Sequence, residues 1–249
     1  MAEPALKAAV SSAHPLATAA GLQILANGGS AFDSAVAVAF ALTVVESDQS
    51  SAISGDGFGL FLRADRGELR SADWSSRTPL SPAFRDRVDE IGDPLGPLSV
   101  QAPSALAGIL AVHREFGSLP LGDVLAPAIT YAEEGFPVSV PLHSAIVNCE
   151  PVCAQHPQTA RNFLREGRAA PIGAPIRLPE LARTLRMIAA DGADALYGGA
   201  IADEILAFVQ QIGGVLTRED LDLAAAAPVW SVPLETSYRG YRLHAVPPV

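Results

Sequence analysis

Residues 28–45 read GGSAFDSAVAVAFALTVV, a pair of glycines followed by a stretch with very few polar side chains. Gly28 and Gly29 supply a left-handed stop for one helix, and Ser30 or Asp33 can cap a second helix over residues 32–45. Because this second helix is apolar nearly all round, we expect it to be buried on several sides. Its many alanines allow neighbouring backbones to approach closely. A buried, alanine-rich helix therefore decides the fold.

Another helix is expected before this helix, and a β-hairpin is expected after it. Residues 15–26 precede it, with apolar residues at helical spacing and Pro15 in the position that suits a first helical turn. The glycine-rich residues 55–59 follow it and lead into a β-hairpin expected over residues 58–63 and 68–74. Gly67 stands in the turn of that hairpin, where a positive φ is tolerated.

The rest of the chain is expected to be mainly helical. Helices are expected over residues 103–116, 122–134, 178–190, 199–212 and 217–223. Residues 81–97 and the stretch through Cys149 and His156 are expected as surface excursions. Residues 238–245 form a strand candidate with no evident partner nearby. This order predicts an α+β fold in one domain over residues 1–249.

Composition narrows the classes of partner. The 249 residues carry a formal net charge of −10, and no run of lysine and arginine could follow a phosphate backbone, so nucleic acid is not expected as a partner. The longest apolar run, residues 35–45, is shorter than the roughly 20 residues of a membrane span. Residues 1–12 lack the apolar core of a secretory signal. We expect a cytoplasmic protein with no membrane partner.

Two clusters have a chemical and a structural interpretation. The glycines of residues 55–59 could cradle a phosphate, but such loops follow a strand and open a helix, whereas this one opens a strand. A tight turn is therefore favoured there. Cys149, Cys153 and His156 could bind a metal, but a closed zinc site has four ligands and no second pair of ligands follows. A surface helix with two free thiols is favoured, and neither a metal nor a cofactor is expected.

Arg77 lies in the stretch DWSSRTP of residues 73–79, directly after an expected strand. Arginine is the natural two-pronged partner of a carboxylate, so Arg77 could bind an acidic substrate. The alternative is a structural arginine that bonds loop carbonyls, and the pattern alone favours this alternative.

Motifs along nearly the whole chain resemble the large subunit of the gamma-glutamyltranspeptidase family. They are His14-Pro15-Leu16-Ala17, Gly28-Gly29-Ser30-Ala31-Phe32-Asp33, Val45-Glu46, Ser54-Gly55-Asp56-Gly57-Phe58, Phe116-Gly117, Pro127-Ala128-Ile129, Gly135-Phe136, Tyr197-Gly198-Gly199, Gly213-Gly214 and Tyr238-Arg239-Gly240-Tyr241. They occur in the same order as in the family. The chain is therefore identified as a member of this family. Because of the departure at Ser75 described below, it looks more like the transpeptidase-like branch, which includes amidohydrolases and acylases.

The resemblance implies an N-terminal-nucleophile hydrolase. In such an enzyme an αββα sandwich is shared between two subunits that self-cleavage (autoprocessing) cuts from one precursor. The family nucleophile is a threonine at the start of the small subunit, which is expected beyond residue 249. No catalytic residue is therefore expected in this chain, and its sandwich is expected to be incomplete. Its partner would be the C-terminal, small catalytic subunit of the same precursor.

The resemblance also points to a substrate pocket. Transpeptidases proper carry Asp-x-Arg-Glu-x-Ala-Pro, in which the arginine holds the α-carboxylate of glutamate. When the motif is aligned on Asp73 and Pro79, Ser75 stands in the place of that arginine and Arg77 follows two residues later. Along a strand this shift moves a side chain by roughly 6.6 Å. We expect Ser75, Ser76 and Arg77 to line the pocket, with a γ-glutamyl or another small-acid acyl group as its ligand.

A second departure from the family pattern is Ser104, which follows Pro103 where the family usually has glycine. We expect this change to affect backbone geometry only.

The leading functional hypothesis is a gamma-glutamyltransferase-like enzyme, a hydrolase or acyltransferase of small-molecule amides that works through an acyl-threonine intermediate. The resemblance implies a link to glutathione metabolism. This chain would supply scaffold and acyl pocket. One alternative is a truncated, catalytically inactive family member or binding domain, and another is an unrelated α+β protein.

Overall fold

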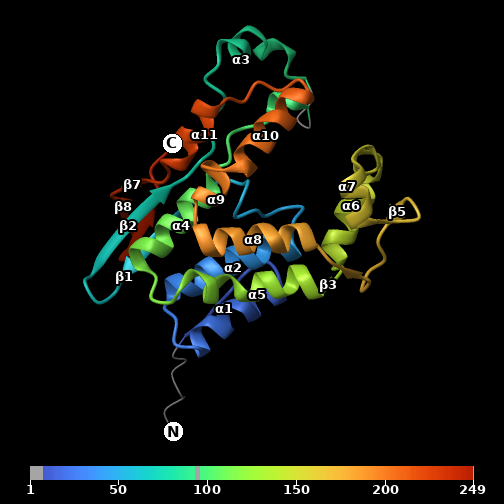
Figure 1. Cartoon of the computed structure of the whole chain (residues 1–249). Coiled ribbons are helices and arrows are strands. Elements are labelled where there is room, and N and C mark those ends of the chain that lie inside the picture. Colours follow the sequence, from blue (N-terminus) through green and yellow to red (C-terminus); the bar gives the residue numbers. More distant parts are fainter. Residues whose placement is uncertain (1–7, 93–95, 249) are drawn as a thin grey trace. The chain divides into compact units, whose positions relative to one another are not determined.

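The computed structural model describes residues 8–92 and 96–248 (Figure 1). Residues 1–7 of the 1–12 segment, residues 93–95 of the 81–97 excursion and the last residue lie outside this part. The chain forms two compact units. The first contains residues up to Ser51 together with His113–Ala190, and the second contains Ala52–Val112 together with the residues from Asp191 onward.

The first unit is built around the helix that the sequence singled out. α2 (Ala31–Val45) packs against α1 (Pro15–Ala26) and α5 (Leu121–Glu134). The alanines at the contact between α1 and α2 are fully buried: Ala17, Ala20 and Ala41. Small side chains let the helix backbones come close. The prediction of a buried, alanine-rich helix is confirmed.

The caps of these helices follow from the local sequence. Gly28 has φ +90° and ends α1, in a backbone region that an L-residue rarely adopts. Ser30 caps α2, since its hydroxyl accepts the N–H of Asp33 at 3.1 Å, and the Asp33 carboxylate accepts the N–H of Ser30 at 2.7 Å. Of the two candidate caps, Ser30 is thus the cap and Asp33 completes the capping box.

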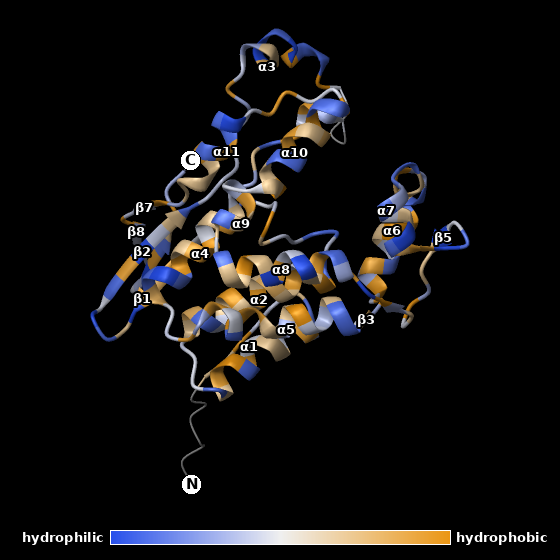
Figure 2. Cartoon of the chain, viewed as in Figure 1, coloured by the Kyte–Doolittle hydropathy of each residue, from blue (hydrophilic) through white to orange (hydrophobic). Residues whose placement is uncertain are grey.

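The first unit also contains three further helices and two short strand pairs. These are α6 (Val140–Gln155), α7 (Pro157–Phe163), α8 (Pro179–Asp191), β3 (Phe136–Pro137) with β6 (Pro175–Ile176), and β4 (Leu164–Arg165) with β5 (Arg168–Ala169). Figure 2 shows hydrophilic and hydrophobic residues alternating along α8. The stretch through Cys149 and His156 is mostly helical. Ser139 caps the start of α6 with a hydroxyl that accepts the N–H of Leu142.

An antiparallel sheet organises the second unit. β1 (Phe58–Arg63) pairs with β2 (Glu68–Asp73), which pairs on its other side with β7 (Val229–Ser231). Gly67 has φ +61° in the β1–β2 turn, as predicted. The helices that belong to this unit or begin in it are α3 (Pro82–Asp86), α4 (Ala105–Phe116), α9 (Asp194–Tyr197), α10 (Ala200–Gln211) and α11 (Arg218–Ala225), with 3-10 turns at Val88–Glu90 and Pro97–Ser99.

The strand expected over residues 238–245 is wrong in its bounds and in having no local partner. It is a hairpin of β8 (Leu234–Tyr238) and β9 (Tyr241–Ala245). Arg239 and Gly240, with φ of 49° and 84°, make the two-residue turn between them. Positive φ at both turn residues matches the twist of paired strands, so the turn brings β8 alongside β9.

The mixture of helices and antiparallel strands agrees with the expected α+β class. Among the described residues, no helix is both long enough and apolar enough to cross a membrane.

Candidate functional site

The segment that carries the predicted pocket residues, residues 74–80, begins where β2 ends at Asp73. It has no regular secondary structure. The comparison of side-chain positions along a strand therefore does not apply to Arg77. What fixes the segment is a set of contacts at its two ends.

Trp74 anchors the start of the 74–80 segment. Its N–H donates to the carbonyl of Gly57 at 2.8 Å, which extends the β1–β2 pairing by one bond. Its indole ring lies against Gly108 in the first turns of α4, so closely that a Cβ at this position would stand 2.4 Å from Trp74 Cγ. Glycine is required at such a close approach. Only a residue without a side chain lets the ring pack on this helix.

Ser104 adds a hydrogen bond to the same anchor. It is 3% exposed, and its hydroxyl donates to the carbonyl oxygen of Trp74 at 2.5 Å. Its oxygen also lies 3.2 Å from the hydroxyl oxygen of Ser76. Because a serine hydroxyl has one proton and Ser104 donates it to Trp74, the hydroxyl of Ser76 is the donor to Ser104. The expectation that Ser104 affects only backbone geometry is wrong.

Asp220 fixes the other end of the segment. It is 4% exposed, and its Oδ1 accepts the N–H of Leu80 at 2.8 Å. Its Oδ2 accepts the N–H and the hydroxyl of Thr217 at 2.8 and 2.6 Å, which is the capping box of α11. The sequence pattern predicts this capping box. Both carboxylate oxygens are thus occupied by the scaffold.

Two cavities adjoin the 74–80 segment. One of about 190 Å³ lies over α11, and one of about 480 Å³ lies next to residues 246–248. Both are lined by Asp73, Ser75, Arg77 and Val229, and the second is lined by Ser76 as well. The structure thus brings all three predicted pocket residues to one place.

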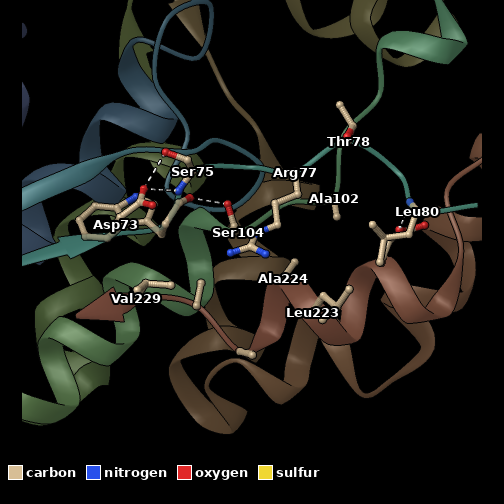
Figure 3. Close-up of a pocket in the computed structure, with 14 residues that line it drawn as sticks. Asp73, Ser75, Arg77, Thr78, Leu80, Ala102, Ser104, Leu223, Ala224 and Val229 are labelled. Atoms are coloured by element: carbon tan, nitrogen blue, oxygen red, sulfur yellow. Dashed lines mark hydrogen bonds between the residues drawn. The ribbon is translucent and has the colours of Figure 1, made fainter. Parts of the chain in front are cut away.

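Among the residues that line these two cavities, Arg77 is well placed to bind an acidic ligand. Among the described residues lining the two cavities it is the one cation, and its side chain is exposed. In Figure 3 it extends toward the side of the cavity where Ser104 and Ala224 are labelled. No hydrogen bond or ion pair joins its guanidinium to any other described residue. The interpretation of Arg77 as a structural arginine bonded to loop carbonyls is therefore not supported.

The hydroxyls of Ser75 and Ser76 both donate to groups of the scaffold. The backbone N–H and the hydroxyl of Ser75 both donate to Asp73 Oδ1, at 2.9 and 2.6 Å. The hydroxyl of Ser76 donates to Ser104. With their protons used in this way, both hydroxyls keep only acceptor capacity toward a ligand.

Asp73 and Ser104 also belong to the site, although the sequence did not single them out as pocket residues. Asp73 served only to align the motif. The role of Ser104 depends on the start of α4 meeting residue Trp74, thirty positions earlier in the chain. No local sequence pattern predicts a contact between residues so far apart in the chain.

The structure also shows the surroundings of the two other clusters, the glycines of residues 55–59 and the two cysteines. The glycines of residues 55–59 lead into β1 as a close backbone approach, where Ala105 donates its N–H to the carbonyl of Gly55 at 3.0 Å. Cys149 and Cys153 are free thiols on α6, the first exposed and the second partly buried. Within the part of the chain that the structure describes, no group of three or more His, Cys, Asp or Glu side chains could hold a metal ion.

Several known proteins are similar to this chain in sequence or in fold. The chain is 34% identical over 247 residues to the glutathione hydrolase proenzyme of Escherichia coli (strain K12), with 96% of this chain and 42% of that protein covered. It is 35% identical over 246 residues to the Acylase ACY 1 proenzyme of Pseudomonas sp. (strain SE83), with 94% and 44% covered. The crystal structure of Helicobacter pylori gamma-glutamyltranspeptidase superposes with a TM-score of 0.89 at 30% identity, over 99% of this chain and 71% of that chain.

The chain thus spans less than half the length of these two sequence relatives. The family model described as gamma-glutamyltranspeptidase matches residues 17–249, which is nearly the whole chain. This chain belongs to the gamma-glutamyltranspeptidase family.

Proposed function

We propose that this chain is the scaffold and acyl-pocket part of an amide hydrolase or acyltransferase. In the proposed reaction a threonine hydroxyl, supplied by polypeptide that follows residue 249, attacks the carbonyl carbon of a small-molecule amide. The C–N bond breaks, the amine leaves with a proton, and an acyl-threonine ester forms. Water or a second amine then takes the acyl group and releases the threonine. Membership of a family whose relatives are named as hydrolases and acylases supports this proposal.

Exposed apolar surface supports the view that more polypeptide completes the fold. Phe58, Leu60 and Leu62 alternate along β1 and therefore share one face of the strand, and they are 64%, 40% and 58% exposed. All residues of β8 and β9 are exposed as well. Contiguous exposed apolar patches generally mark interaction surfaces. We propose that the small catalytic subunit of the same precursor covers them in an αββα sandwich.

The single observation that carries the substrate assignment is the unpaired guanidinium of Arg77 between two cavities. An arginine that no described scaffold group engages suits a carboxylate of the ligand. The ligand would be an amide whose acyl group bears a carboxylate, either γ-glutamyl, as in glutathione, or another small diacid. We also propose that residues 1–249, whose described part forms two compact units, belong to a single domain, and that the protein is cytoplasmic.

The test uses the full-length gene product and three p-nitroanilides. Butyryl-p-nitroanilide has no carboxylate, glutaryl-p-nitroanilide adds one at the end of the acyl chain, and γ-glutamyl-p-nitroanilide adds an ammonium group beside it. We expect turnover of at least one carboxylate-bearing anilide with a lower KM than that of the butyryl compound. Intact mass should show two chains. A single uncleaved chain without turnover would instead support the inactive or binding-domain alternative.

A further inference from the structure

The start of α4 reaches the pocket segment at two points. Ser104, whose carbonyl accepts the N–H of Gly108 at 3.1 Å, stands at the beginning of this helix. Its hydroxyl contacts the carbonyl of Trp74, and one turn later Gly108 packs against the Trp74 ring. Both contacts come from the first turn of one helix. Two contacts from it to one residue fix both the main chain and the ring of Trp74.

The contact continues toward Arg77. Ser76, the residue directly before Arg77, gives its hydroxyl proton to Ser104, so two of the three residues that lead to Arg77 are bonded to one buried side chain. Beyond Arg77 the next such bond is at Leu80, whose N–H is held by Asp220. Arg77 itself has no bond to the described scaffold. Its position therefore depends on the main chain on either side, and Ser104 fixes the nearer side.

We propose that Ser104 is a positioning residue for Arg77 and thereby sets the affinity of the site for carboxylate ligands. This inference rests on the proposed function of the pocket as an acyl-carboxylate site. Without the Ser104 hydroxyl, the carbonyl of Trp74 and the hydroxyl of Ser76 lose their common partner. The main chain before Arg77 then samples more conformations, and a two-pronged contact is sensitive to such displacement because both bonds need the same plane.

The chain offers a closely matched control. Ser34 in α2 is 3% exposed, like Ser104, and its hydroxyl donates to a main-chain carbonyl, that of Gly21, at 3.0 Å. Ser34→Ala therefore removes the same kind of bond as Ser104→Ala, but from the contact between α1 and α2 and not from the 74–80 segment. Comparing the two variants separates a loss of stability from a loss of positioning.

The experiment measures direct binding to the full-length protein by calorimetry, so it does not depend on turnover. The probes are glutarate, which carries carboxylates, and glutaramide, its uncharged diamide. We expect the wild type to bind glutarate more tightly than glutaramide. Ser104→Ala should raise the Kd for glutarate about tenfold and leave that for glutaramide unchanged, whereas Ser34→Ala should change neither, and Ser104→Thr should restore much of the affinity.

An unchanged Kd for glutarate in Ser104→Ala, or an equal loss for both probes, would overturn the proposal. So would a wild type that binds the two probes equally. If Ser104→Ala fails to fold, Ser76→Ala takes its place, since it removes only the outer of the two bonds. A smaller but selective loss for glutarate is then expected, and no loss would overturn the proposal. Absence of amide cleavage would count against the proposed function alone.

Discussion

The carboxylate of Asp33 in α2 accepts the backbone N–H and the hydroxyl of Ser118, 85 residues further along the chain, at 3.0 and 2.6 Å. The N–H and the hydroxyl of Ser30 donate to the same carboxylate at 2.7 and 2.8 Å. Asp33 has no exposed surface. One side chain thus serves both as the capping-box partner of α2 and as the attachment of the loop after α4. A buried carboxylate with this many donors is held in its charged form.

Acid should destabilise the first unit through Asp33. Burial raises the pKa of this carboxyl, but hydrogen bonds from Ser118 and Ser30 outweigh burial and lower the pKa to about 2, from an ordinary value of 3.8. A pKa lowered by folding stabilises the protein above the ordinary value and stops doing so as the pH falls through 3.8 toward 2. Allowing for solvent screening, this contribution is about 1–2 kcal/mol.

Urea unfolding of the full-length protein at pH 7 and pH 3 measures this contribution. Asp33→Asn should lower the unfolding free energy at pH 7, and the loss on going to pH 3 should be smaller in the variant than in the wild type. Glu204→Gln, a change at an exposed carboxylate, is the control. Identical acid sensitivity of the Asp33 variant and the wild type would show that another group is responsible.

Gly108→Ala should destabilise the second unit. The added Cβ would stand 2.4 Å from Trp74 Cγ, so the indole or the helix must move, at a cost of about 1–3 kcal/mol. Gly122→Ala in α5 is the matched control, because a Cβ there meets nothing within 4 Å. It should be neutral, or stabilising by up to about 1 kcal/mol, since alanine is the better helix former. Thermal unfolding with Trp fluorescence compares the two, and equal melting temperatures would contradict the close packing.

How far the sequence could predict this fold depends on the range of each contact. Gly67 and the Thr217–Asp220 cap act within a few residues of themselves, and the structure confirms the positive φ of Gly67 and the capping box. β7 was missed because it is three residues long and its partner β2 lies about 160 residues away. A strand that short has no period to detect, and only the folded chain brings its partner alongside.

In the candidate site too, the sequence could predict some residues, while others could be recognised only in the folded chain. The composition of residues 73–79 and the family resemblance were enough to propose Ser75, Ser76 and Arg77 as pocket residues, and these three adjoin one common cavity. Whether Arg77 was bonded to the scaffold could not be predicted, because that depends on every group within reach in three dimensions. Ser104 became part of the site for the same reason.

The two thiols of α6 should react at different rates. Both are free, and Cys149 is exposed. Burial, followed by the nearby Cys149, raises the pKa of the Cys153 thiol. The thiolate is the reactive form, so a raised pKa means a smaller reactive fraction at pH 8. Titration with a disulfide reagent should give one fast and one slow phase, and Cys149→Ser should remove the fast one. Loss of the slow phase instead would reverse the assignment.

Arg77→Ala in the full-length protein should mainly raise the KM of the proposed amide cleavage for a carboxylate-bearing anilide. Two charge-assisted hydrogen bonds would be lost, each worth roughly 1.5 kcal/mol or more, so an increase in KM of about 100-fold or more is expected with little change in kcat. Arg77→Lys keeps the charge but not the planar fork and should fall between wild type and Ala. Arg66→Ala, at the exposed β1–β2 turn, should leave KM unchanged. Because a purely structural arginine would affect the butyryl anilide as well, only a selective effect on the charged substrate assigns Arg77 to carboxylate binding, and an unchanged KM would remove it from the site.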